Sequence, residues 1–192
     1  MKKHAVRRLL GVLCLWWLLA LSAGAADEKI TVRDFALYPS GKQGVLVANI
    51  HFNYQLTDYL RESLLNGVSL QHEVRFDLVW HSDWWFNKTE PVKRIQSELK
   101  YHALSRHYQV LRKDTNEHWN FANLASALAH LGTIERYALP VLPDDAYHNN
   151  ASLYIEAVLE PKDPDNLPLG LSSLFSDKHR LVSQGVLWAL TP

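Results

Sequence analysis

The sequence predicts a mainly β protein: an antiparallel, β-sandwich-like domain with two short α-helices. Three observations lead to this fold class. Apolar and polar residues alternate along most of the chain, with the period of two that is typical of strands with one buried face. The opposite faces of these strands are polar, which argues against a parallel sheet covered on both sides. Two segments, at about 57–66 and 120–131, have helical spacing instead.

The clearest strand is expected at 68–80, where Val74 and Trp80 belong to an apolar face and Glu73 and Arg75 to a polar face. Continuous alternation over this length would make a strand of roughly 40 Å, so we expect a bend or a bulge within it. Other strands are expected in segments with the same kind of pattern, at 30–38, 45–54, 95–102, 108–111, 153–159 and 182–190.

Capping residues mark the two helices. Thr57 is placed to cap the first helix, and Asn66-Gly67 is placed to end it. The second helix is expected to begin near Asn120 and to end at Gly132, after an apolar stripe with many alanines.

The N-terminus reads as a secretory signal peptide. A start with four basic residues and no acidic one leads into an apolar run, Leu9–Leu21, and then into small residues. Ala23-Gly24-Ala25 fits a cleavage site, so we expect a signal peptide at 1–25 and a single exported β-rich domain at 26–192, with cleavage after Ala26 as the alternative. An uncleaved anchor in the inner membrane is the other interpretation, but a spanning helix needs roughly 20 apolar residues, and this run is shorter.

The composition of the exported part excludes several classes of chemistry. The only cysteine, Cys14, lies in the leader, so the domain has no disulfide, thiolate nucleophile or cysteine-based zinc site. Four of the 20 Lys and Arg residues precede residue 26, which leaves 16 against 20 Asp and Glu, a net charge of −4. This sign argues against nucleic acid and against anionic membrane surfaces as partners.

No motif predicts a catalytic residue, a cofactor or a metal. Of the 10 histidines, nine follow the leader, yet no pair has recognisable ligand spacing. His102 and His107 are five residues apart, which on one extended chain puts them on opposite faces. His72 lies alone on an apolar face, which is typical of a core histidine. No nucleophile elbow and no phosphate-binding loop is present.

The most unusual local feature is the aromatic segment 80–86. Its large rings, Trp80, Trp84, Trp85 and Phe86, are the candidate binding surface. They could form an aromatic platform for a ligand, a glycan or a partner protein. The alternative is structural, with the rings closing one mouth of the sandwich. We favour the structural interpretation, because aromatic residues are first of all core material.

Several segments, in order, resemble a family of exported proteobacterial proteins, the domain of unknown function 4390. The matching pieces are Leu60–Leu70, Trp84-Trp85-Phe86, Tyr101–Val110, Phe121–Gly132, Leu167-Pro168 and Trp188. The resemblance covers nearly all of the mature chain and brings no catalytic residue with it. It implies a periplasmic protein, and its members' gene neighbourhood implies a link to an envelope sensor histidine kinase.

Taken together, these features predict a non-enzymatic periplasmic interaction or accessory domain whose partner is an envelope protein or a sensor kinase. The first alternative is a carrier of a small ligand or lipid, with an apolar cavity between the sheets. The second alternative is a hydrolase whose histidine and carboxylate are scattered in the sequence and converge in one cleft.

Overall fold

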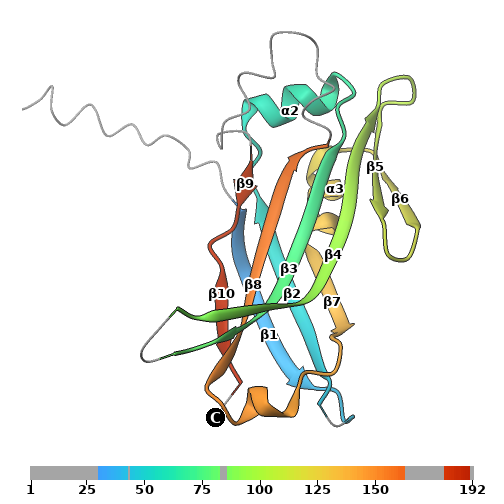
Figure 1. Ribbon diagram of the computed structural model, residues 1–192. Coiled ribbons are helices and arrows are strands. Elements are labelled where there is room, and N and C mark those ends of the chain that lie inside the picture. The colour runs from blue at the N-terminus through green and yellow to red at the C-terminus, as the bar shows by residue number, and fades with distance from the viewer. Residues whose placement is uncertain (1–29, 43, 83–85, 163–179, 191–192) are drawn as a thin grey trace, which may run out of the picture.

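The computed structural model describes residues 30–42, 44–82, 86–162 and 180–190 (Figure 1). The expected leader and the candidates Trp84 and Trp85 lie outside this part of the chain. Among the described residues, no helix is both long enough and apolar enough to cross a membrane.

The strands form two antiparallel sheets, as predicted (Figure 1). The smaller sheet has the order β1–β2–β7, with strands β1 (Ile30–Pro39), β2 (Leu46–Tyr54) and β7 (Thr133–Ala138). The larger sheet has the order β10–β8–β3–β4–β5–β6, and β9 also pairs with β8. Its strands are β3 (Leu70–Trp80), β4 (Lys88–His102), β5 (His107–Arg112), β6 (Glu117–Phe121), β8 (Ala151–Pro161), β9 (Leu181–Val182) and β10 (Val186–Ala189).

The first helix, α2 (Asp58–Leu65), has the predicted cap, because the Oγ1 of Thr57 accepts a hydrogen bond from the Leu60 N–H at 3.0 Å. The second helix, α3 (Leu124–Leu131), ends at Gly132 as predicted. Its expected start near Asn120 is wrong, because Asn120 is part of β6. The helix is capped instead by Asn123, whose Oδ1 accepts from the Ser126 N–H at 2.8 Å. A short 3-10 helix, η1 (Asp144–Tyr147), precedes β8.

The main core is one contiguous cluster of buried side chains from both sheets and both helices, and a small second cluster contains Leu78, Ala146 and Ala151. Ile50 of β2, Phe76 of β3 and Ile155 of β8 are at most 1% exposed, and Leu60 of α2 and Leu131 of α3 belong to the same cluster. Each large apolar side chain buried in this way contributes about 1.5–3 kcal/mol. The inner faces of the two sheets are therefore held together mainly by apolar packing.

A bulge lies opposite the long strand β3 rather than within it, because β3 pairs with β8 in unbroken register along its whole length. Phe76 is opposite Lys93 but Asp77 is opposite Pro91, so Val92 is the extra residue of a bulge in β4. A proline has no backbone N–H to give to the ladder, and bulges are among the few places where a sheet accepts one. Beyond this point β4 changes direction together with β3, which stays paired with β8 as far as its last residue, and the end of the hairpin then projects from the body (Figure 1).

The two open sides of the sandwich are closed differently. On one side α3 contacts β2 of the smaller sheet and β4, β5 and β6 of the larger sheet. On the other side the outer strands β1 and β10 meet through side chains, where the rings of Phe35 and Trp188 lie 5.4 Å apart. A single parallel bridge joins Ile30 to Ser183 nearby.

Candidate functional site

The candidate aromatic residues that the structure describes have different environments. Trp80 is half-buried and packs on a small cluster formed by Leu78, Ala146 and Ala151. Phe86, in contrast, is 90% exposed. Trp80 thus packs as a structural residue, whereas Phe86 is free to contact a ligand or a partner.

Polar contacts fix the base of this hairpin end. The Nε2 of His81 lies 2.9 Å from the Oγ of Ser152 on β8, and the Ser82 N–H donates to the Oδ1 of Asn87 at 3.3 Å. Lys88 and Glu90 form an ion pair on the returning arm. The first two contacts connect the hairpin end to β8 and to its own returning arm, while the ring of Phe86 remains in solvent.

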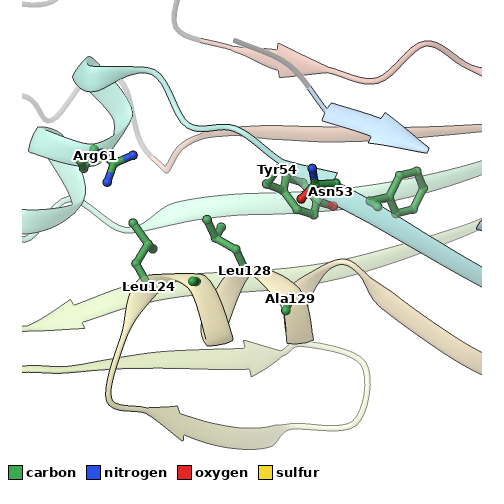
Figure 2. A pocket seen from close by; sticks show the side chains of 8 residues that line it. Asn53, Tyr54, Arg61, Leu124, Leu128 and Ala129 are labelled. Carbon is green, nitrogen blue, oxygen red and sulfur yellow. The ribbon is translucent and has the colours of Figure 1, made fainter. Parts of the chain in front are cut away.

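A second candidate site is a surface pocket of about 280 Å³ between the two helices (Figure 2). Figure 2 shows Arg61 of α2 and Asn53 of β2 at opposite ends of this pocket, with Leu124 and Leu128 of α3 projecting between them. The complete lining is Phe52, Asn53, Tyr54, Arg61, Leu124, Ala125, Leu128 and Ala129. The pocket thus combines an apolar floor with one cationic and one amide group.

Gly132 sets the position of α3 against β2. The Phe52 N–H donates a hydrogen bond to the carbonyl of Gly132 at 2.9 Å. A Cβ at Gly132 would lie 2.3 Å from the carbonyl oxygen of Phe52 and 2.8 Å from the ring of Tyr54. Only glycine permits this approach, so the pocket wall formed by α3 has a fixed place relative to the sheet.

Behind the pocket, the hydroxyl of Tyr54 and the Nε2 of His72 lie 2.5 Å apart, and both residues are buried. Burial, with a smaller contribution from the Arg112 charge, lowers the pKa of His72 to about 3, and burial raises the pKa of Tyr54 well above its ordinary value. His72 is therefore neutral, and its Nε2 shares a buried hydrogen bond with the Tyr54 hydroxyl. The prediction of a core histidine is confirmed.

The expectation that His102 and His107 lie on opposite faces is wrong. They are directly opposite each other on β4 and β5, and their rings stack at 4.7 Å with 16° between the planes. The reason is a turn between them, in which Arg106 has a φ of 52°, so the two residues do not belong to one extended segment. In the part of the chain that the structure describes, no group of three or more His, Cys, Asp or Glu side chains could hold a metal.

A histidine and a carboxylate approach each other on the smaller sheet. The Nε2 of His51 lies 3.7 Å from the Oε1 of Glu135, with the side chains 38% and 62% exposed. Neither residue lines the pocket between α2 and α3. The two side chains lie on neighbouring strands and are accessible to solvent. They do not form a cleft that could orient a substrate.

Charged side chains on the larger sheet neutralise one another. Arg75 contacts Glu73 at 2.6 Å, Arg94 contacts Asp77 at 2.6 Å, and Gln96 donates to Glu73 at 2.8 Å. Hydrogen bonds from Arg75 and Gln96 lower the pKa of Glu73 even though burial alone would raise it. Glu73 is thus ionised and paired with arginine, which suits a structural network better than a proton-transfer site.

Sequence reasoning missed the pocket between the helices. Its residues come from β2, α2 and α3, and Arg61 and Leu124 are more than sixty positions apart in the chain. One feature of the sequence could have indicated this pocket. The helix α3, LASALAHL, has no Asp, Glu, Lys or Arg, although a surface helix usually has charged residues.

Comparison with known proteins gives a family assignment. No curated protein and no solved structure matches the chain. The sequence model of one family, described as "Domain of unknown function (DUF4390)", matches residues 27–184, which is most of the chain. The protein therefore belongs to the DUF4390 family, as its sequence motifs indicated.

Proposed function

We propose that this protein is an exported, periplasmic, non-enzymatic interaction domain, and that it docks on an envelope protein through the β3–β4 hairpin. The observation that carries the proposal is the exposure of Phe86, at 90%, beyond the bend of a hairpin that projects from the body (Figure 1). An envelope sensor histidine kinase is the first partner to test, because the family resemblance implies that link.

The geometry suits docking on a protein surface. Aromatic side chains dominate the energetics of many protein interfaces, because they bury a large area with few rotatable bonds. The contact between His81 and Ser152 and the hydrogen bond from the Ser82 N–H to Asn87 connect the hairpin end to β8 and link its two arms before a partner arrives. Such pre-ordering lowers the entropic cost of association.

The packing of the interior favours this proposal over a carrier. The carrier considered above would hold its ligand in an apolar cavity between the two sheets. The facing sides of the two sheets are instead filled by a contiguous cluster in which Leu70, Phe76 and Leu153 are fully buried. A hydrolase needs a histidine and a carboxylate in contact within one cleft. His51 and Glu135 are in contact but exposed to solvent. Asp144 and His148, in contrast, line one surface pocket of about 760 Å³ but form no hydrogen bond or ion pair with each other.

The test is a crosslinked pull-down from the envelope of the native host with tagged mature protein. The informative variant is Phe86→Ser, and Leu104→Ser is the matched control, because Leu104 is 104% exposed at the turn between β4 and β5. We expect the wild type and Leu104→Ser to recover the same envelope protein and Phe86→Ser to lose it. Equal recovery by all three forms would show that the hairpin is not the docking surface.

A further inference from the structure

The outer surface of α3 is unusually apolar for a helix in contact with solvent. The helix has no Asp, Glu, Lys or Arg, although Ala125, Ser126 and Ala129 are exposed and Leu124 and Leu128 are only half-buried. A helix at the surface of a soluble domain ordinarily has charged residues on its outer face. An exposed apolar surface of this kind is a feature of binding sites.

The residue that faces this apolar surface is a cation. Arg61 of α2 is exposed at one end of the pocket and forms no ion pair with any described residue (Figure 2). The neighbouring acids on the helix, Asp58 and Glu62, do not line the pocket. A guanidinium offers a planar set of N–H donors that matches a carboxylate.

We propose that the pocket between α2 and α3 binds an aliphatic carboxylate. Its carboxylate lies at Arg61, and its hydrocarbon chain lies across Leu124 and Leu128, toward Asn53. Leu124 and Leu128 are one helical turn apart, about 6 Å along the axis. The volume of about 280 Å³ is close to the lower limit for small-ligand pockets, so the chain is short.

The pocket is built before a ligand arrives. The close approach of Gly132 to Phe52 fixes α3, and the Thr57 cap fixes the first turn of α2. Leu60 and Leu64 anchor α2 in the core, each with no exposed surface. Little of the binding free energy is then needed to order the site. This inference does not depend on the proposed function, which concerns the exposed end of the β3–β4 hairpin around Phe86 and not this pocket.

The experiment is an NMR titration of ¹⁵N-labelled mature protein with octanoate. We expect saturable shifts of the backbone amides of Asn53, Ala125 and Ala129, with a Kd of about 1 mM because the pocket is small and open. Octan-1-ol has the same chain without the charge, and it should bind about fivefold more weakly because it makes no charge-assisted hydrogen bond.

Two variants and a control locate the site. Arg61→Gln should weaken octanoate about fivefold, and Ala125→Glu should abolish binding, because it places a like charge in the pocket. Glu62→Gln, on the same helix but outside the pocket, should bind octanoate at least as well as the wild type. All three positions are exposed, and circular dichroism checks that each variant is folded. Shifts that do not saturate, that map elsewhere, or that persist unchanged in Arg61→Gln would overturn the proposal, as would equal binding of octan-1-ol.

Discussion

The two sides of the sandwich differ in what covers them. On one side α3 bridges the sheets: Gly132 approaches the backbone of β2, and the ring of His130 lies 4.5 Å from that of Trp119 and 5.2 Å from that of Phe121. On the other side, a bridge joins Ile30 of β1 to Ser183, between β9 and β10, and the ring of Phe35 in β1 contacts that of Trp188 in β10. The first side is closed by a packed helix and the second by two local contacts.

The two sides of this sandwich are therefore covered unequally. A strand at the edge of a sheet exposes unpaired N–H and C=O groups, which proteins commonly cover or protect with charged residues. The sequence of β10, VLWA, has no charge, and Leu187 and Trp188 are 56% and 39% exposed. We therefore expect the side with β1 and β10 to open locally before the side with α3.

The largest difference should appear when a methyl group is added at the glycine on each side. At Gly132 a new Cβ meets the backbone oxygen of Phe52, which cannot move away, so Gly132→Ala should lower the free energy of unfolding by about 3 kcal/mol or more. At Gly185 a new Cβ meets the far end of the half-buried Tyr154 ring, which can rotate. Gly185→Ala should therefore cost about 1 kcal/mol.

Urea denaturation of both variants measures this difference. Gly41→Asn is the control, because Gly41 has a φ of 78° with nothing within 4 Å of its Cβ position, and asparagine tolerates that backbone. If Gly132→Ala and Gly185→Ala lost the same free energy of unfolding, the α3 side would not be more tightly packed than the side with β1 and β10.

Lowering the pH should have a somewhat smaller effect on the free energy of unfolding, through His72 on the side that α3 covers. The pKa of His72 is about 3 in the folded protein and ordinarily 6.5, so between these values the unfolded chain binds the extra proton. Stability is then lost as the pH falls below 6.5, by about 2–3 kcal/mol at pH 4.5. Replacing both partners, in the double variant Tyr54→Phe with His72→Leu, leaves no polar group of the pair unsatisfied and should remove this part of the pH dependence.

Comparison with the wild type is needed because other groups titrate as well. Burial and the Arg112 charge also lower the pKa of His130, so part of the acid sensitivity should remain in the double variant. Hydrogen bonds from Lys162 and Ser69 lower the pKa of Glu98 against the effect of burial, and this contribution is lost only below about pH 4.5. Equal slopes of stability against pH from 6.5 to 4.5 in both proteins would exclude His72 as the cause.

The fold was largely predictable because its signals are local. The Thr57 cap and the alternation of 68–80 each depend on a few neighbouring residues. The start of α3 was not predictable in the same way, because Trp119 and Phe121 of β6 pack on His130 of the helix itself. The short strands β6 and β7 were missed for a related reason: neither has enough alternation to be distinguished from a turn or a helix end.

The candidate sites depend on contacts between distant segments. Phe86 is exposed because the bulge between Pro91 and Lys93 redirects a hairpin, and no rule of composition gives the direction of that bend. The pocket forms only when Gly132 brings α3 against β2, opposite Arg61. His102 and His107 were misplaced because a turn was treated as extended chain.

The smallest expected effect concerns the contact that closes the side with β1 and β10. Trp188→Ala removes the edge-to-face contact with Phe35 but exposes little core, so it should cost about 1 kcal/mol of global stability. Its main effect should be local. Hydrogen exchange, followed by mass spectrometry, should become faster in β1 and β10 and remain unchanged in α3, because the helix is held by separate contacts to β2 and β6. If exchange in α3 became faster to the same extent, the two sides would be one cooperative unit, and their different coverings would not make them independent.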